Sequence, residues 1–126
     1  MSKEIKQIVE LTVVRVIAGG NAGDGGYFYS FSPDILLSEA PGKIIYRLSE
    51  DSSQGLQIRT VVDSASDGQM SPPEIKADGS EAIVQNHLIK PELINVAVIV
   101  IDLERPGLFI KCDPQVLNVP DPAHIG

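Results

Sequence analysis

Apolar and polar residues alternate through much of the chain, which is the pattern of β-strands that bury one face. Near the start, Val9, Leu11 and Val13 are separated by polar residues, so this segment predicts a strand and not a helix. The segment KIIYRL at residues 43–48 repeats the same period of two. Both segments therefore predict half-buried strands.

The segment LQIRTVV at residues 56–62 alternates as well. An unbroken period of two places Leu56, Ile58 and Thr60 on one face of the strand and Val61 on the other. We therefore expect Thr60 to face the core and Val61 to face away from it.

The strongest strand signal is near the end of the chain. VAVIVI at residues 96–101 is continuously apolar, which is typical of a central strand covered on both faces. The tripeptide RPG at residues 105–107 supplies a turn, and LFIKCDPQVLNV at residues 108–119 returns. This pair predicts an antiparallel hairpin.

Proline and glycine mark the breaks between these segments. Pro33 cannot donate a backbone hydrogen bond, so it predicts a sheet edge or a strand break. In APGK, Pro41 is expected to open a turn in which Gly42 adopts a positive φ. Two long loops are expected, at residues 18–26 and 63–81, because both are rich in glycine or in small polar residues.

Seven or eight short strands separated by turns predict an all-β fold. Regular spacing of short strands is typical of a two-sheet antiparallel sandwich with an immunoglobulin-like or related Greek-key arrangement. At 126 residues the chain is expected to form one such domain, residues 1–126.

Composition acts mainly by excluding classes of function. The net charge is −7, and the ten basic residues are scattered, so we expect no nucleic-acid partner. No apolar run approaches the roughly 20 residues that a spanning helix needs, so we expect no membrane partner. The single cysteine excludes an internal disulfide, and MSKEIKQIVE does not read as a secretory signal, so a cytoplasmic location is expected.

The order His87, Cys112, His124 raises the question of a copper site in a cupredoxin-like sandwich. A blue-copper centre needs two imidazoles and a thiolate, with a weak axial ligand. Eleven residues separate Cys112 from His124, no methionine follows, and Met70 lies in an earlier loop. The copper-ligand loop is therefore missing, and Cys112 is expected to be a buried, inert residue of the last strand.

The sequence evidence for other kinds of site is weaker still. The carboxylates of DSASDGQ, at residues 63–69, resemble part of a calcium loop but lack its bidentate glutamate. Nothing in the sequence places His87 beside Cys112 to activate a nucleophile. The segment GGNAGDGG lacks the lysine of a phosphate loop. We expect no catalytic, cofactor-binding or metal-ligating residues.

The chain ends in CDPQVLNVPDP, where Asp113-Pro114 and Asp121-Pro122 each disfavour a regular ladder. We interpret this segment as a kinked last strand whose prolines blunt an exposed sheet edge.

This ending, together with FSP at residues 31–33 and the pattern G-x-I-x-Y-x-L at residues 42–48, resembles the small bacterial DP-EP family. The resemblance implies a bacterial β-sandwich and supplies no catalytic residue. Inclusion-body proteins of the AidA type also resemble the chain distantly, which would suggest assembly.

The leading hypothesis is a non-enzymatic β-sandwich module that binds a protein or associates with itself. The alternative is a domain that binds a metal or a small ligand through the long loops at residues 21–26 and 64–80.

Overall fold

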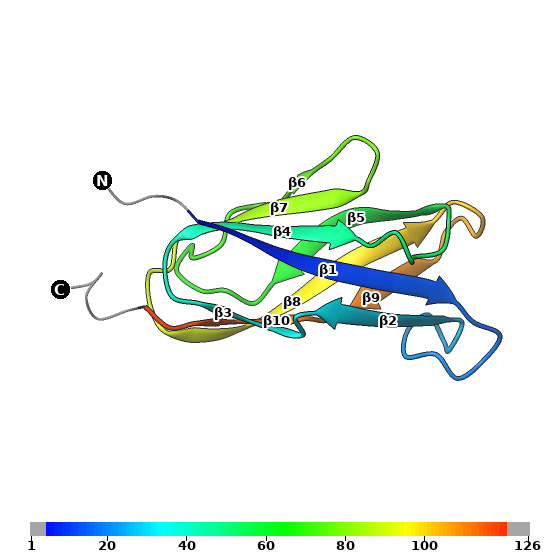
Figure 1. The fold of residues 1–126 in the computed structure, drawn as a ribbon, viewed down its shortest axis with the longest axis horizontal. Coiled ribbons are helices and arrows are strands. Elements are labelled where there is room, and N and C mark those ends of the chain that lie inside the picture. Colours follow the sequence, from blue (N-terminus) through cyan, green and yellow to red (C-terminus); the bar gives the residue numbers. More distant parts are fainter. Residues whose placement is uncertain (1–4, 121–126) are drawn as a thin grey trace.

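The computed structural model describes residues 5–120, which Figure 1 shows as an elongated all-β molecule. These residues form ten strands in two five-stranded sheets, so the predicted all-β sandwich is confirmed, with more strands than the seven or eight expected. Residues 5–120 hold no helix of the length and hydropathy needed to cross a membrane. The strands are β1 (Ile5–Arg15), β2 (Tyr27–Ser32), β3 (Ile35–Ser38), β4 (Gly42–Leu48), β5 (Leu56–Asp63), β6 (Glu74–Ile75), β7 (Glu81–Asn86), β8 (Glu92–Asp102), β9 (Phe109–Cys112) and β10 (Gln115–Asn118).

Sheet 1 has the strand order β2-β1-β4-β7-β6, and sheet 2 has the order β3-β10-β8-β5, with β9 also paired to β8. The sheets are mixed, which corrects the expectation of a purely antiparallel sandwich. β1 runs parallel to β4, and β3 runs parallel to β10. The β1–β4 pair is parallel because the chain visits sheet 2 as β3 before it returns to sheet 1 beside β1.

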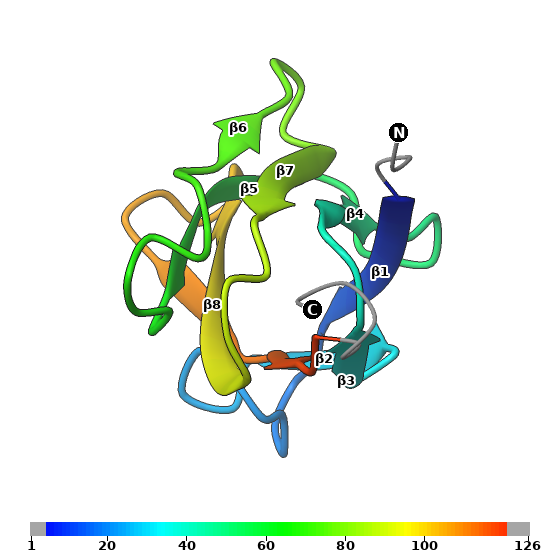
Figure 2. The same ribbon diagram turned by 90° about the vertical axis from the view of Figure 1, so that its left-hand side faces the viewer.

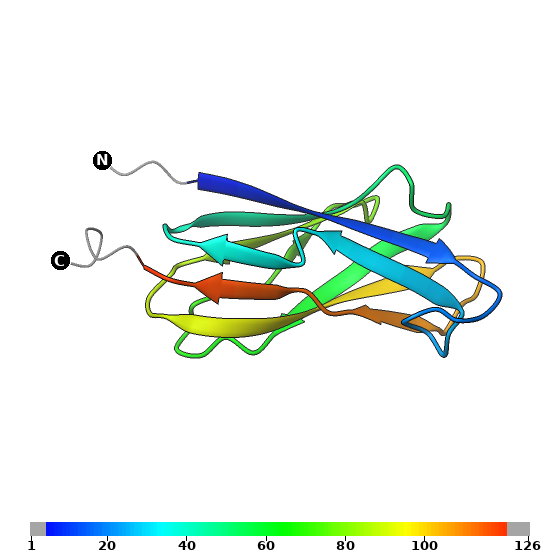
Figure 3. The ribbon, with the colours of Figure 1, turned by 60° about the horizontal axis from the view of Figure 1, so that its bottom comes forward.

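The change of sheet occurs at Pro33. β2 pairs with β1 up to Ser32, and the next strand, β3, lies beside β10 in the other sheet (Figure 3). The strand break predicted from Pro33 is therefore confirmed, since the ladder cannot continue through a residue that has no N–H. The transfer of the chain to the second sheet was not predicted.

The core lies between the two sheets, which Figure 2 shows from one end. Val9, Leu11 and Val13 are at most 1% exposed, as the alternation predicts. On β8 the buried residues alternate with half-buried or exposed ones, so the prediction that this strand is covered on both faces is wrong. β8 is central within its sheet, but no further layer covers its outer face in the described part of the chain.

One register prediction fails on β5. The pairing with β8 shifts between Ile58 and Thr60, so an extra residue enters the strand as a β-bulge. The bulge reverses the alternation, and Val61 is buried while Thr60 is only half-buried. The sequence alternates through this point without a glycine or proline that would reveal the bulge.

The predicted terminal hairpin is confirmed, with Val98 opposite Cys112 on β9. The strand breaks at Asp113-Pro114 as expected, and the carbonyl oxygen of Pro114 still accepts a hydrogen bond from the amide of Val96 at 3.1 Å. The prolines do not form a blunted edge, however, because β3 covers the far side of β10. Asp121 and Pro122 lie outside the described residues.

Gly42 has a different role from the one predicted. Its φ is not positive. Instead it lies opposite Ile5 at the start of the parallel β1–β4 pair, where a Cβ atom would overlap the carbonyl oxygen of Ile5. The position needs glycine for close approach of two backbones, not for a turn.

We expect Gly42→Ala to lower the free energy of unfolding by about 1–3 kcal/mol, because β1 must shift to admit the methyl group. Gly26→Ala is the matched control: its φ is also not positive, and its Cβ would lie 3.3 Å from the nearest atom. Chemical denaturation measures both. Equal effects of the two substitutions would contradict the close approach at Gly42.

Candidate functional site

The structure does not assemble the residues considered for copper. His87 is exposed just after β7 of sheet 1, whereas Cys112 is fully buried on β9 of sheet 2. His124 lies outside the described residues. Between residues 5 and 120, no cluster of three or more His, Cys, Asp or Glu side chains could hold a metal ion.

Cys112 is a core residue. Burial, and to a smaller extent the negative charge of Asp113, raise the pKa of its thiol to about 12. The thiol is therefore protonated at neutral pH, and a protonated thiol is a poor nucleophile. Cys112 thus packs β9 against the core.

We expect the Cys112 thiol of the native protein to react with an aromatic disulfide reagent at least about 100-fold more slowly than in denaturant, because reaction requires both opening and deprotonation. The release of thiolate from the reagent, followed by absorbance at pH 8, checks this. Equal rates in native and denatured protein would contradict the burial of the thiol.

The carboxylates of the long polar loop are held apart by local bonds. Asp63 accepts a hydrogen bond from the amide of Ala65 at 3.0 Å. Asp67 pairs with Lys90 at 2.7 Å, and this lysine lowers the pKa of the Asp67 carboxyl. Asp63 therefore stabilises its own turn and Asp67 pairs with a residue of another loop, and the two do not converge as calcium ligands would.

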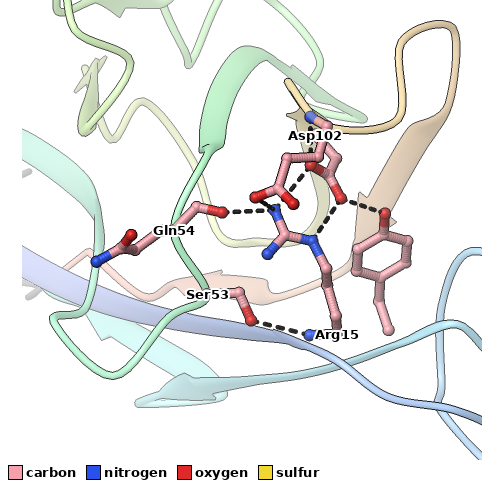
Figure 4. A network of polar contacts seen from close by, with 6 residues as sticks. Arg15, Ser53, Gln54 and Asp102 are labelled. Carbon is pink, nitrogen blue, oxygen red and sulfur yellow. Dashed lines mark hydrogen bonds and ion pairs between the residues drawn. The ribbon is translucent and has the colours of Figure 1, made fainter.

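A charged cluster that sequence reasoning missed lies at the end of the sandwich where β1 and β8 finish (Figure 4). The side chain of Asp102 is fully buried and receives two hydrogen bonds of 2.8 Å from Arg15. The Tyr27 hydroxyl donates a third at 2.6 Å, and the Glu104 amide a fourth at 2.9 Å. Arg15 also donates to the carbonyl oxygen of Gln54 in the β4–β5 loop.

The electrostatics of this cluster follow from that geometry. Hydrogen bonds from Arg15, opposed by desolvation and helped by Tyr27, hold the pKa of the Asp102 carboxyl well below its usual range. The hydrogen bond to Asp102 raises the pKa of Arg15 further. An ionised carboxylate with four donors and no exposed surface is a poor proton acceptor, and its partners come from β1, β2 and the turn after β8, so the cluster joins these elements.

Buried amides occupy the opposite end of the sandwich. Asn86 of β7 and Asn118 of β10 exchange two hydrogen bonds, of 2.7 and 3.0 Å, across the sheets. Asn118 also donates to Gln69, which in turn donates to Glu92 at 2.6 Å. Among the described residues, no buried side-chain nitrogen or oxygen lacks a partner. This network is therefore a structural tie between β7, β10 and the long loop.

The sequence does carry a signal for both clusters. On β1, every second residue from Val9 to Val13 points inward, and Arg15 is the next position in this series. On β8, the series of inward-facing residues ends at Asp102. In the same way, the inward-facing positions of β7 and β10 end at Asn86 and Asn118. A polar residue that ends an inward-facing series predicts a buried polar tie at the end of a sandwich.

The outer face of sheet 2 carries large apolar side chains in register. Leu117 of β10 lies directly opposite Leu37 of β3 on one side and Leu93 of β8 on the other. Leu37 and Leu93 are 51% and 52% exposed. We call these three residues the leucine row. Ile35 lies on β3 and is 55% exposed, and Val119 directly follows β10 and is 42% exposed. The exposed apolar surface therefore extends beyond the row in both directions along these strands.

A hollow of about 730 Å³ adjoins this surface, at the place where β2 gives way to β3 and the chain breaks between β9 and β10. Its lining mixes aromatic and polar side chains, among them Tyr29, Asp34, Asn95, Lys111 and Gln115. Tyr29 belongs to β2 of sheet 1, whereas Asn95, Lys111 and Gln115 belong to strands of sheet 2 and Asp34 directly precedes β3. The hollow therefore depends on the change of sheet at Pro33.

No protein-family model matches this chain, and no curated protein matches it in sequence.

Proposed function

We propose that this protein is a non-enzymatic β-sandwich module that binds protein through the outer face of sheet 2, with a second copy of the chain as its first partner. The leucine row carries the proposal. Exposed apolar side chains in direct cross-strand contact form a continuous patch, and such patches are typical of interaction surfaces. Removing apolar area from water stabilises a complex by about 25 cal/mol per Å² before the costs of association.

Sheet 2 is favoured over sheet 1 because of the charges around the apolar residues. Sheet 1 has a comparable row in Ile8, Ile45 and Ile83. That row is flanked by Lys6 opposite Lys43 on one side, and on the other by charged residues that include the Arg47–Glu81 ion pair. The leucine row has uncharged Gln115 and Asn95 as its neighbours on one side, and on the other side the charged neighbour along β3 is Glu39, which is exposed just beyond the end of that strand. Burying the row therefore desolvates fewer charges than burying the row of sheet 1.

The free edge of sheet 2 supports the same interface. β3 bonds β10 on one side, with the Asp34 and Ser38 carbonyl oxygens accepting from Gln115 and Val119. In a parallel pair the intervening residues, Ile35 and Leu37, direct their amides away from the partner strand. On that outward side the Leu37 carbonyl oxygen accepts a hydrogen bond from the Gln7 side chain at 2.9 Å, whereas the amides of Ile35 and Leu37 have no partner among residues 5–120. The patch and these free amides thus coincide on β3, and a self-complementary patch suits a two-fold symmetric pair.

A non-enzymatic role is supported by the state of the reactive groups among residues 5–120. The Cys112 thiol is buried and protonated, and the Asp102 carboxylate is saturated with hydrogen-bond donors.

The proposal also includes an immunoglobulin-like arrangement, membership of the DP-EP family and a cytoplasmic location. The segments that carry the resemblance form the sheet change at Pro33, β4 and β10, so the resemblance involves ordered parts of both sheets.

We expect the wild-type chain to sediment as a dimer at micromolar concentration and Leu93→Lys to sediment as a monomer, because the substitution places a charge within the leucine row. Ile8→Lys is the matched control, since Ile8 is 46% exposed on the outer face of the other sheet. Sedimentation equilibrium distinguishes them. A monomeric wild type would remove self-association, and equal loss of association in both variants would move the interface away from the leucine row.

A further inference from the structure

The hollow beside β3 continues into a second one. A shallower depression of about 200 Å³ lies over β5 and β8 and is lined by Val62, Ser64 and Ala97. The two hollows share three lining residues, Asn95, Lys111 and Asp113. They therefore form one groove that runs from the side of the sandwich across the β9–β10 break to β5.

The break in the strand at Pro114 positions this groove. Pro114 interrupts the outer surface between β9 and β10, while Asn95 on β8 lies opposite Gln115. On the side of the sandwich, Tyr29 packs edge-to-face on Phe31 with ring centroids 5.7 Å apart, and its hydroxyl accepts a hydrogen bond from the amide of Asp113 at 3.3 Å. An aromatic side chain held by two contacts thus forms one wall of the groove.

The polar groups in the groove include both donors and acceptors that have no partner within residues 5–120. Gln115 donates to Asn95 at 3.0 Å, which leaves the Gln115 Oε1 acceptor and the Asn95 Nδ2 donor free among those residues. The carboxylate of Asp34 accepts no hydrogen bond within residues 5–120 and lines the same hollow. Lys111 and Asp113 lie 3.8 Å apart and are 68% and 52% exposed, so both are available to a ligand.

From these features we infer that the groove binds a neutral, polyhydroxylated ligand, namely an oligosaccharide. Each hydroxyl group both donates and accepts, so it matches a wall that offers free donors beside free acceptors. The apolar face of a sugar ring matches the aromatic wall at Tyr29. A groove for an anion would need basic residues without the carboxylates of Asp34 and Asp113, and a groove for an apolar ligand would lack most of these polar groups.

The size of the groove sets the length of the ligand. The first hollow alone is within the range of about 300–1,000 Å³ that small-molecule sites occupy. Because the second hollow extends it past Lys111, the groove accommodates more than one sugar unit. A trisaccharide is therefore expected to bind more tightly than its monosaccharide.

The test is a titration of ¹⁵N-labelled protein with a panel of neutral sugars: maltotriose, cellotriose, xylotriose, mannotriose and tri-N-acetylchitotriose, each beside its monosaccharide. At least one trisaccharide should shift the amide signals of residues 111–115 and Tyr29, with an affinity at least about threefold above that of its monosaccharide. Tyr29→Leu and Asp34→Ala should each weaken that binding by about tenfold or more.

Two variants control for folding and for the protein interface. Tyr29→Phe keeps the aromatic wall and should bind within about threefold of the wild type. Leu93→Lys should bind the sugar at least as tightly as the wild type does, because Leu93 does not line the groove and association through the leucine row would cover Asn95 and Gln115, which do. The proposal is overturned if no trisaccharide binds at about 10 mM, if binding survives both Tyr29→Leu and Asp34→Ala, or if spermidine binds the groove while every sugar fails.

Discussion

Replacing Asp102 with alanine is expected to lower the free energy of unfolding by about 3–5 kcal/mol, because it removes a buried carboxylate with four hydrogen bonds and leaves the partly buried Arg15 with only Glu104 and the Gln54 carbonyl oxygen as partners. The substitution removes both hydrogen bonds to the Arg15 guanidinium and also leaves the Tyr27 hydroxyl and the Glu104 amide unpaired. These groups come from β1, β2 and the β8–β9 turn. Urea denaturation monitored by circular dichroism measures the change.

Two milder substitutions separate the contributions within this cluster. Tyr27→Phe removes one hydrogen bond and should cost about 1–2 kcal/mol. Glu104→Gln should cost less than about 1 kcal/mol, because the Glu104 side chain is 65% exposed and its ion pair with Arg15 is screened by water. If Asp102→Ala cost no more than Glu104→Gln, the cluster would not tie the strands together.

The same carboxylate makes stability depend on pH. The pKa of Asp102 is lowered in the folded state, so its contribution is present above the unfolded pKa and is lost as pH falls toward the folded pKa. With an unfolded pKa of about 3.9, the wild type should lose about 1 kcal/mol of this contribution between pH 7 and pH 3. The Asp102→Asn variant has no carboxyl group at this position. The difference in free energy of unfolding between the wild type and this variant should therefore be smaller at pH 3 than at pH 7 by that amount.

Asn118→Ala is expected to lower the free energy of unfolding by about 2–4 kcal/mol, because it removes three buried hydrogen bonds worth about 1 kcal/mol each and leaves a cavity. Two of these bonds join Asn118 to Asn86 and the third joins it to Gln69. Asn86 retains a bond to Ser38 and Gln69 one to the amide of Lys90, so neither is left wholly unpaired.

The matched control for Asn118→Ala is Asn95→Ala, which removes an exposed amide from the outer face of the same sheet. Asn95 accepts one exposed hydrogen bond from Gln115, so its loss should cost less than about 1 kcal/mol. Thermal denaturation of both variants provides the comparison. A cost for Asn118→Ala as small as that for Asn95→Ala would contradict the role of the amide network.

The alternation of apolar residues was sufficient to predict β1 and β4, because burial of one face of a strand imposes a period of two on the sequence. The continuous apolar run at residues 96–101 predicted β8 and the terminal hairpin, but not that only one face of β8 is buried. Three features of the fold could not be predicted from the pattern of apolar residues. The parallel pairs depend on contacts between distant segments, the bulge at Thr60 is hidden in an uninterrupted alternation, and Pro33 marks a break without showing that the chain changes sheets. Gly42 was assigned to a turn when its requirement comes from Ile5, 37 positions earlier in the sequence.

The candidate sites were less predictable than the strands. The sequence directed attention to Cys112 and His87 as rare residue types, and the structure places one in the core and the other at the surface. Arg15 and Asp102 are common types, 87 residues apart, and only the strand order brings them together. The groove is assembled from β2, β3, β5, β8, β9, β10 and the segment between β9 and β10, so no single sequence motif could contain it.

The most direct test of the proposed interface is hydrogen–deuterium exchange at the free edge of β3, measured at low and at high protein concentration. If the outer face of sheet 2 associates with a second copy, the amides of Ile35 and Leu37 should exchange more slowly at high concentration, while those of β6, at an edge of the other sheet, should not change. Equal exchange of Ile35 and Leu37 at both concentrations would contradict the account.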